Sequence, residues 1–222
     1  MIVDSETRLS DLPFVHAVYQ ARSIGGGSFV SNATTQWEMV ITKQTGKVTL
    51  SLRGPETKAS SAPIPKDAEF MGIIFKHGTF MPRLPGDKLV DLEIHLPETG
   101  KNSFQLFGDT WEFPNFENVD TFVGRLLRKD LVAHDDVVAD VLRGRTQDLS
   151  LRSIQRRFLH VTGLTYKAIQ QVERARKAVE LLQSGVPILD TTYQTGYFDQ
   201  AHLTRSLKLL YGQTPGEIVK LG

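Results

Sequence analysis

The 222-residue sequence contains no cysteine, which excludes disulfide bonds and thiolate chemistry. It has no apolar run of the roughly 18 residues that a membrane-spanning helix needs. Residues 1–9 carry acidic side chains and lack the apolar segment of a secretion signal. We therefore expect a cytoplasmic protein that does not enter a membrane.

The sequence also lacks the clusters that metal sites and enzymes need. Its six histidines are scattered, without a His-x-His or His-x-x-x-His pair. The glycine run at residues 25–27 lacks the lysine of a phosphate-binding loop and does not precede a helical pattern. The sequence shows no recognisable Ser-His-Asp pattern and no recognisable pair of catalytic carboxylates. We expect no enzyme activity, no metal and no cofactor.

The net charge of +1 hides an uneven distribution. Residues 1–114 contain 11 Lys and Arg against 13 Asp and Glu, whereas residues 115–222 contain 15 against 12. Within residues 145–177 the balance is 8 against 2. Such an excess of positive charge favours binding to a polyanion, because each phosphate that Lys or Arg neutralises releases counterions. A solvated helix face is the alternative, and charge alone does not separate the two.

The first half of the chain has the pattern of a β-rich domain. Apolar or alternating segments predict strands over residues 37–41, 46–52, 70–75 and 89–96. Prolines and glycines between these segments mark turns. The pattern predicts a small antiparallel sandwich or barrel, which we assign to residues 1–114.

After Pro114 the apolar spacing becomes helical, and only Pro187 and Pro215 remain among the prolines. Residues able to begin a helix precede each periodic segment. The expected helices begin after Asn118 or Asp120, after Asp135 or Asp136, and after Ser150, Thr165, Pro187 and Asp199. We assign residues 115–222 to an all-α domain, which makes the chain a two-domain α+β protein.

Two segments of the helical half, residues 151–165 and 200–214, match each other at an offset of 49 residues (200 − 151). In each, apolar residues recur at helical spacing, and a glycine and a threonine follow. The matched pairs are Ile154 and Leu203, Phe158 and Leu207, Val161 and Leu210, Arg156 and Arg205, Gly163 and Gly212, and Thr165 and Thr214. The match indicates one supersecondary unit used twice.

Each matched helix separates an apolar face from a polar stripe. The residues of the first helix expected to face a core are Leu151, Ile154, Phe158 and Val161. The opposite stripe contains Arg152, Gln155, Arg156 and the apolar Leu159, and its equivalent in the second helix contains Ala201, Thr204, Arg205 and Lys208. Arginine can read guanine and glutamine can read adenine in the major groove, which favours a helix-turn-helix DNA reader. An all-α scaffold with ordinary charged surfaces is the alternative.

Residues 150–217 resemble the DNA-binding domain of the AraC/XylS family. The segment 188–208 matches the family's signature almost throughout, and Gly212-Gln213-Thr214-Pro215 completes it. Arg174-Ala175-Arg176 and Leu181-Leu182 resemble the helix that joins the family's two helix-turn-helix units, which we expect over residues 166–183. The resemblance implies two recognition helices that enter successive major-groove segments on one face of the DNA.

The resemblance assigns DNA contacts to residues of both recognition helices. The predicted DNA-binding residues are Arg152, Gln155, Arg156, Gln200, Ala201, Thr204, Arg205 and Lys208. Ala201 can only touch a thymine methyl group, and Lys208 fits a phosphate, which positions the protein without reading sequence. For each residue the alternative is an exposed, solvated side chain.

The sequence departs from the family pattern at two places. A glycine-containing stretch, residues 142–149, precedes Ser150 where the family has a shorter turn. Thr191 and Thr192 stand where an aliphatic residue and an alanine are usual. Their hydroxyl groups need backbone acceptors if they are buried.

Residues 1–114 resemble, less closely, the cupin-like domain that precedes the DNA-binding domain in such regulators. This resemblance implies a domain that senses a small-molecule effector or mediates dimerisation. Candidate residues for an effector pocket are Trp37, Phe75, Phe80 and Trp111. The alternative is that these aromatic side chains are ordinary core residues.

Together these expectations describe a sequence-specific transcription regulator that binds double-stranded DNA. RNA polymerase, a small-molecule effector and a second copy of the chain are its further expected partners. Activation is the commoner mode in the resembled family, and no residue excludes repression. The alternative function is a small-molecule-binding or protein-interaction module whose helical half does not read bases. An assembly helix of that kind is expected to be apolar where this chain has Arg152, Gln155 and Arg156.

Overall fold

The computed structural model describes residues 2–221, and the backbone forms two compact units. The first contains the chain up to Ser28 together with Gln36–Pro55 and Pro63–Thr165. The second contains Phe29–Thr35, Glu56–Ala62 and the chain from Tyr166 onward. A compact unit need not fold on its own, whereas a domain does. The division into domains of residues 1–114 and 115–222 therefore stays a prediction.

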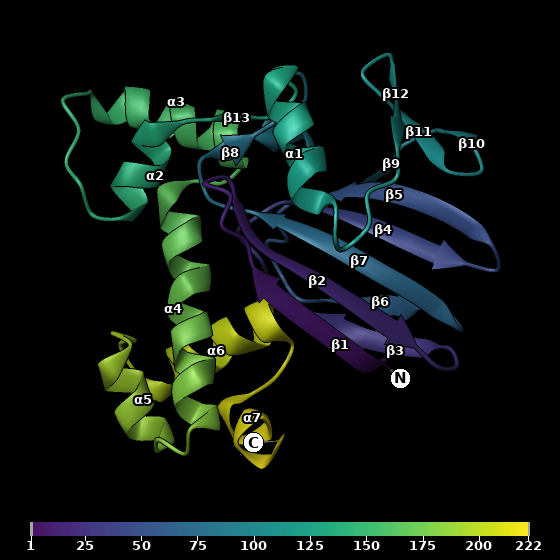
Figure 1. The fold of residues 1–222 in the computed structure, drawn as a ribbon. Helices are drawn as coiled ribbons and strands as arrows, with labels where there is room; N and C mark the ends of the chain where they lie inside the picture. The colour runs from purple at the N-terminus through teal and green to yellow at the C-terminus, as the bar shows by residue number, and fades with distance from the viewer. Residues whose placement is uncertain (1, 222) are drawn as a thin grey trace. The chain divides into compact units, whose positions relative to one another are not determined.

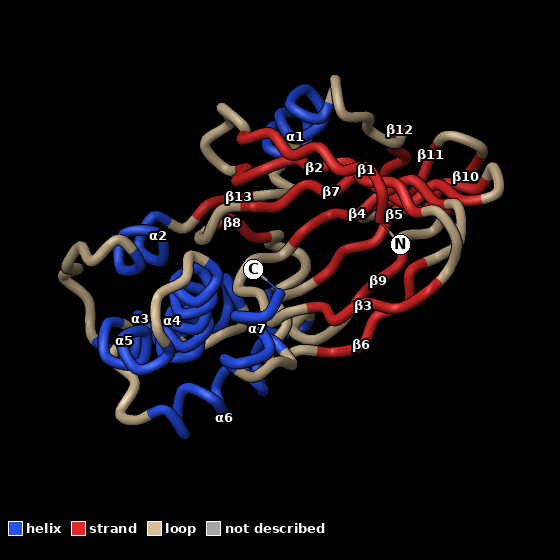
Figure 2. Tube along the Cα trace, turned by 90° about the horizontal axis from the view of Figure 1, so that it is seen from below, coloured by secondary structure: helices blue, strands red, loops and turns tan. Residues whose placement is uncertain are grey.

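The first unit is built on a six-stranded antiparallel sheet in the order β1-β2-β7-β4-β5-β9 (Figures 1 and 2). Its strands are β1 (Ile2–Leu9), β2 (Val15–Ser23), β4 (Glu38–Gln44), β5 (Lys47–Arg53), β7 (Ala68–Phe75) and β9 (Glu93–His95). A three-stranded sheet consists of β10 (Glu98–Gly100), β11 (Ser103–Leu106) and β12 (Asp109–Glu112). Two short pairs are β8 (Thr79–Phe80) with β13 (Ala133–His134), and β3 (Gly27–Ser31) with β6 (Ser60–Ile64). Over the described residues β1 and β9 are free edges, so the large sheet is open and not a barrel.

One face of the large sheet forms the core of the first unit. Met39 and Ile41 of β4 are buried in this core, and Val40 between them is buried as well, so this part of the strand is covered on both sides. The helix α1 (Val119–Arg128) and the three-stranded sheet contribute Phe122, Phe104 and Trp111 to the same core. The ring of Phe122 meets both other rings edge-on. Burying one such side chain contributes about 1.5–3 kcal/mol.

The predicted fold class is confirmed, with antiparallel strands in the N-terminal half and helices in the C-terminal half. The strands predicted over residues 37–41, 46–52 and 70–75 correspond to β4, β5 and β7. The strand predicted over residues 89–96 is wrong for most of its length. A 3-10 helix, η1 (Gly86–Lys88), precedes a turn in which Asp91 has a φ of 56°, and this left-handed residue interrupts extended backbone.

The C-terminal half contains α2 (Asp136–Leu142), α3 (Leu151–Thr162), α4 (Tyr166–Gln183), α5 (Ile188–Gln194), α6 (Gln200–Tyr211) and α7 (Pro215–Leu221). The first compact unit includes α2 and α3, whereas the second includes α4 to α7. The long helix α4 covers the range expected for the joining helix. The sequence pattern did not predict α7.

The central helix of the second unit is α4 (Figure 1). Its buried residues recur every three or four positions and are Ile169, Val172, Ala175, Ala178 and Leu182. The last four of these share one core with Leu203, Leu207 and Leu210 of α6. On the exposed side of α4, Arg176 pairs with Glu173 and Glu180, each about one turn away. Packing of this apolar face against the core, and not helix propensity alone, stabilises α4.

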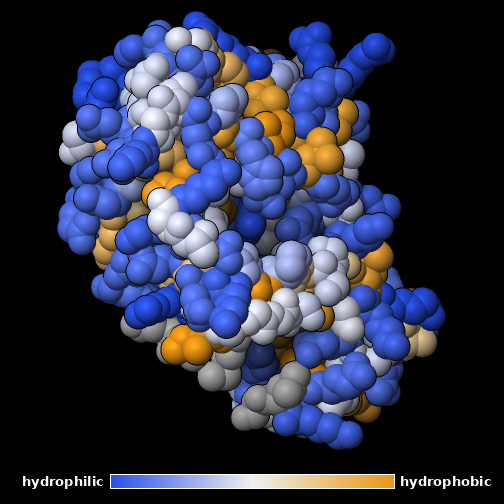
Figure 3. Space-filling model, turned by 90° about the vertical axis from the view of Figure 1, so that its right-hand side faces the viewer, coloured by the Kyte–Doolittle hydropathy of each residue, from blue (hydrophilic) through white to orange (hydrophobic). Residues whose placement is uncertain are grey.

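Exposed apolar side chains are dispersed over the surface. Figure 3 shows one face, on which hydrophilic side chains predominate and apolar side chains form separate patches. None of the helices within residues 2–221 is both long enough and apolar enough to cross a membrane.

We expect Ala175→Pro to disrupt α4. Ala175 is fully buried in the middle of the helix, and proline there removes a backbone hydrogen bond and clashes with the preceding turn. The free energy of unfolding should fall by about 3 kcal/mol or more. Urea unfolding followed by circular dichroism measures the change, with Gln171→Ala on the exposed side as the control. Equal stability of the two variants would contradict a continuous α4.

Candidate nucleic-acid interface

The two matched segments form α3 and α6, and both helices begin with a side-chain cap. The hydroxyl of Ser150 accepts a hydrogen bond from the backbone N–H of Ser153 at 3.2 Å. The carboxylate of Asp199 accepts one from the backbone N–H of His202 at 2.6 Å. Each cap satisfies an N–H group that has no partner within its helix and contributes about 1 kcal/mol. The sequence predicted both caps.

Apolar residues at matched positions fix the rotation of each helix about its axis. Phe158 and Val161 of α3 are buried, and so are Leu203, Leu207 and Leu210 of α6. Both helices therefore turn the same side of the repeat toward a core.

Leu151 does not face a core, contrary to the sequence prediction. Its side chain is 79% exposed. Leu151 is the first residue of α3, and a helical side chain covers the surface over the turn on its N-terminal side. At the first position no helical turn lies there, so the apolar face of α3 begins later.

The outward stripes carry the predicted DNA contacts. The exposed members are Arg152, Gln155 and Arg156 on α3, and Gln200, Ala201, Arg205 and Lys208 on α6. Thr204 is half-buried, and its hydroxyl donates to the carbonyl of Gln200 at 2.8 Å. Thr204 therefore offers an outside partner only its oxygen and its methyl group. Helical spacing places the predicted residues of each helix on one side of it.

The cations of these stripes are Arg152 and Arg156 on α3, and Arg205 and Lys208 on α6. Among the residues that the structure describes, no salt bridge involves Arg152, Arg156, Arg205 or Lys208. In contrast, Arg157 on another side of α3 is held by Asp135 at 2.6 Å. Arg176 of α4 is held by Glu173 at 3.0 Å. Exposed guanidinium groups without an acidic partner remain available for a phosphate or a guanine edge.

The first helix-turn-helix unit consists of α2 and α3. Asp135 caps the N-terminus of α2 and also binds Arg157 of α3, which ties the two helices together. In the long connection between them, Asp140 pairs with Arg145 and accepts a hydrogen bond from the Gln147 amide at 3.3 Å. These contacts hold the first part of a connection that is longer than the family pattern.

The second helix-turn-helix unit consists of α5 and α6. Thr191 and Thr192 of α5 are fully buried. Their hydroxyl groups donate to the carbonyls of Val186 and Ile188, at 3.4 and 2.7 Å. The backbone acceptors that these two departures from the family pattern require are therefore present.

The Gly-Gln-Thr-Pro segment after α6 begins α7. The Glu217 carboxylate accepts a hydrogen bond from the Thr214 N–H at 2.6 Å, and the Thr214 hydroxyl accepts one from the Glu217 N–H at 3.3 Å. This reciprocal pair is a capping box. The hydrogen bonds from the Thr214 backbone and side chain lower the pKa of the Glu217 carboxyl. Ile218 of α7 then packs into the core of α4 and α6.

Two segments of the N-terminal half complete the C-terminal end of α6. The last carbonyl groups of an α-helix have no partner within it. The backbone N–H groups of Ala59 and Ala33 donate to the carbonyls of Leu209 and Leu210, each at 2.8 Å. Ala33 is also buried in the core of the second unit. No pattern in the sequence indicated these contacts, because they join residues more than 140 positions apart.

The glycines that end both recognition helices also lie against residues of the N-terminal half. A Cβ atom at Gly163 would lie 2.3 Å from a methyl group of Val90 and 2.5 Å from the carbonyl oxygen of Gly86. A Cβ atom at Gly212 would lie 3.0 Å from a methyl group of Val30. Both glycines have a left-handed φ, of 73° and 69°. Conformation and space therefore both require glycine at Gly163.

The four aromatic residues considered for an effector pocket have different surroundings. Trp37 and Phe75 are buried and stacked, with ring centroids 3.9 Å apart, and the Trp37 indole N–H donates to a backbone carbonyl. Trp111 is buried in the same core. Phe80 is half-buried, and its ring meets the ring of His160 of α3. The structure brings three of the four into one core, and an effector role stays a prediction.

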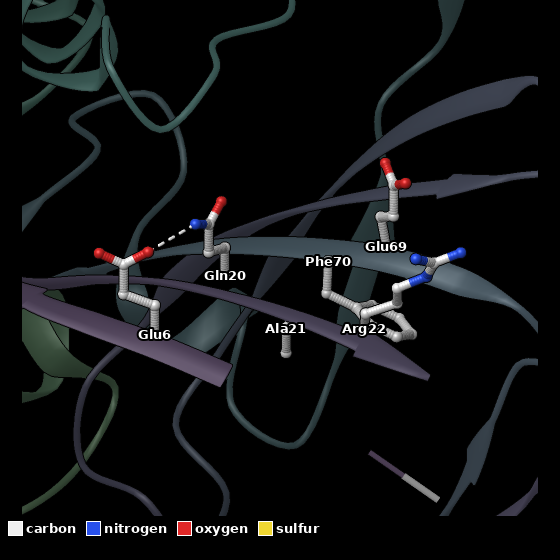
Figure 4. A pocket seen from close by; sticks show the side chains of 6 residues that line it. All are labelled: Glu6, Gln20, Ala21, Arg22, Glu69 and Phe70. Atoms are coloured by element: carbon white, nitrogen blue, oxygen red, sulfur yellow. Dashed lines mark hydrogen bonds between the residues drawn. The ribbon is translucent and has the colours of Figure 1, made fainter. Parts of the chain in front are cut away.

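A shallow hollow lies on β1, β2 and β7 (Figure 4). Its lining side chains are Glu6, Gln20, Ala21, Arg22, Glu69 and Phe70. Glu6 accepts a hydrogen bond from Gln20, and Glu69 pairs with Lys43. Because its acidic groups already have partners, we assign no ligand to it. Over residues 2–221 no three His, Asp or Glu side chains are grouped to hold a metal ion.

We expect Ala33→Asp to destabilise the second unit. A carboxylate at this position would be buried beside Leu210 without a partner, which should cost roughly 2–5 kcal/mol. Asn32→Asp adds the same charge at the adjacent exposed position and is the control. Urea unfolding gives the free energies, and amide hydrogen exchange shows whether α6 opens. If both variants unfolded alike, with unchanged exchange in α6, the contact between Ala33 and α6 would not be important.

Comparison with known proteins agrees with this geometry. Residues 145–220 match the model of a family described as a helix-turn-helix domain, and this range contains both capped helices. A comparison with curated proteins gives no match.

Several solved structures of ToxT from Vibrio cholerae are similar to the chain. One, at 1.65 Å resolution, has 10% sequence identity and a TM-score of 0.42, with 98% of each chain covered. Another, bound to (E)-4-(8-methylnaphthalen-1-yl)but-3-enoic acid, has 10% identity and a TM-score of 0.41, again with 98% of each chain covered. A third, of strain SCE256 with unsaturated fatty acid bound, has 9% identity and a TM-score of 0.41, with 95% of this chain and 96% of that chain covered.

The matched range contains the signature segment 188–208, both Gly-ended recognition helices and α4 between them. Residues 145–220 of the chain are therefore similar to a helix-turn-helix domain family.

Proposed function

We propose that the protein is a sequence-specific regulator that reads two major-groove segments, one with α3 and one with α6. One observation carries the proposal: two helices with side-chain caps at equivalent positions, and with buried residues at two matched positions, both expose a stripe of unpaired cations and amides. A core-facing or assembly-forming helix would place apolar side chains there. The polar stripes therefore favour a DNA reader over an interaction module.

The side chains of the stripes suit distinct DNA groups. Arg156 and Arg205 occupy matched positions and can each donate two hydrogen bonds to a guanine edge. Gln155 fits an adenine edge, and Ala201 fits a thymine methyl group. The short reach of Ala201 makes it a reader only where the helix lies deep in the groove. Lys208 contributes a phosphate contact, which raises affinity for every sequence equally.

Regulation follows from contacts made by the protein while it is bound to DNA. We propose that it acts as an activator in the cytoplasm and that it contacts RNA polymerase there. We further propose that the β-rich N-terminal half senses a small molecule or mediates dimerisation. The contacts of residues 33 and 59 with α6 support this link, because they join the N-terminal half directly to a recognition helix.

We expect Arg156→Ala and Arg205→Ala each to relax specificity at one base position. Loss of a bidentate arginine–guanine contact costs roughly 1–3 kcal/mol of discrimination at that position. Selection of binding sites from a random DNA pool, followed by competition binding, measures it for each variant. The two variants should relax different positions, because the residues lie in different recognition helices.

Arg176→Ala is the control, since Arg176 is an exposed arginine of α4 that is occupied by Glu173 and Glu180 of the same helix. It should leave the base preferences unchanged. If Arg156→Ala and Arg205→Ala weakened binding to all sequences equally, these arginines would contact phosphates and the assignment of readers would be wrong.

A further inference from the structure

A large apolar residue lies exposed immediately before the cap of each recognition helix. Leu149 precedes Ser150 in the first unit, and Phe198 precedes Asp199 in the second. The two positions are equivalent in the repeat, because they also differ by 49 (198 − 149). Leu149 is 41% exposed, and Phe198, at 88%, is more exposed than any other large apolar side chain described. An apolar residue is thus exposed at the same end of both helices, and its exposure is much greater at Phe198.

The exposure of Phe198 is not explained by the packing of the helix. An apolar residue just before an N-cap commonly packs on the fourth residue of the helix, as a hydrophobic staple. For Phe198 that partner would be Leu203, which is already fully buried. Tyr197 takes the inward place instead: it is 5% exposed, and its hydroxyl lies 2.9 Å from the Ser206 hydroxyl. The core is filled by Tyr197, and Phe198 points away from it.

The backbone on both sides of Phe198 is held firmly. On one side, the Tyr197 N–H donates to the carbonyl of Thr192 at 3.0 Å. On the other, Asp199 is fixed by its cap to His202. The backbone therefore holds the base of the Phe198 side chain just before the first residues of α6, and a ring with two rotatable bonds loses little entropy on binding.

We propose that Phe198 recognises the C5-methyl group of a thymine in the DNA segment read by α6. The inference rests on the proposed function, since it requires that the N-terminal end of α6 enter the major groove. The N-terminal residues of a recognition helix are those that approach base edges. The thymine methyl is the apolar group that bases present there, and phenylalanine is among the side chains that contact it. Next to Phe198, the exposed Ala201 offers a second apolar contact of the same kind.

The test removes the methyl group from the DNA and the ring from the protein. Sites selected from random DNA by the full chain are synthesised with each thymine replaced, one at a time, by deoxyuridine, which lacks only the methyl. Binding of each duplex is measured for the full chain, for Phe198→Ala and for Tyr193→Ala. Tyr193 is 68% exposed on α5 and serves as the control for loss of an exposed aromatic ring.

We expect one thymine at which deoxyuridine weakens binding of the full chain roughly fourfold, the effect of about one buried methyl group. Phe198→Ala should bind the thymine and deoxyuridine duplexes at that position equally, whereas Tyr193→Ala should retain the fourfold difference. The inference would be overturned if deoxyuridine at each position weakened binding of Phe198→Ala by the same factors as binding of the full chain. A general loss of affinity in Phe198→Ala, with these factors unchanged, would overturn it as well. If the full chain selected no sequence at all, the proposed function itself would fail, which is a different result.

Discussion

The helices α3 and α6 both end at a glycine in the left-handed conformation, and each glycine lies against a segment of the N-terminal half. Gly163 lacks the Cβ atom that would collide with Gly86 and Val90. Gly212 lies close to Val30, and beside it two backbone N–H groups satisfy the otherwise unpaired carbonyls at the end of α6. Close approach of two backbones is possible only where no side chain intervenes. The N-terminal half is therefore part of the structure that holds each recognition helix.

Two further features fix the orientation of α3 and α6: the caps at their N-terminal ends and the buried residues along each helix. With one face of α6 fixed by Leu203, Leu207 and Leu210, its opposite face cannot turn inward. Among the described residues, Arg205 on that face has no salt bridge, and neither have Arg152 and Arg156 on α3. In contrast, Arg157 and Arg176 are neutralised by carboxylates. On the stripes, attraction of these cations to phosphates and hydrogen bonding to bases can act together.

Local features of this fold were predictable from the sequence, and contacts between distant segments were not. Ser150, Asp199, Gly163 and Gly212 mark helix ends because capping and left-handed backbone depend on the residue itself. The polar strand β1 was not predicted, because it has no apolar pattern. Its side chains are mostly exposed, and it is a strand through its pairing with β2. The predicted DNA-binding residues followed from helical periodicity. The bonds of residues 33 and 59 to α6, and the outward position of Leu151, depend on tertiary packing that periodicity does not contain.

The most direct test of two major-groove readers is protection of bound DNA from dimethyl sulfate. The reagent methylates guanine N7 in the major groove and adenine N3 in the minor groove, so it distinguishes the two surfaces of the helix. Two recognition helices should protect guanine N7 in two stretches about one helical turn apart, and leave adenine N3 reactive. Protection of adenine N3 alone, or of guanine N7 in a single stretch, would contradict reading by both α3 and α6.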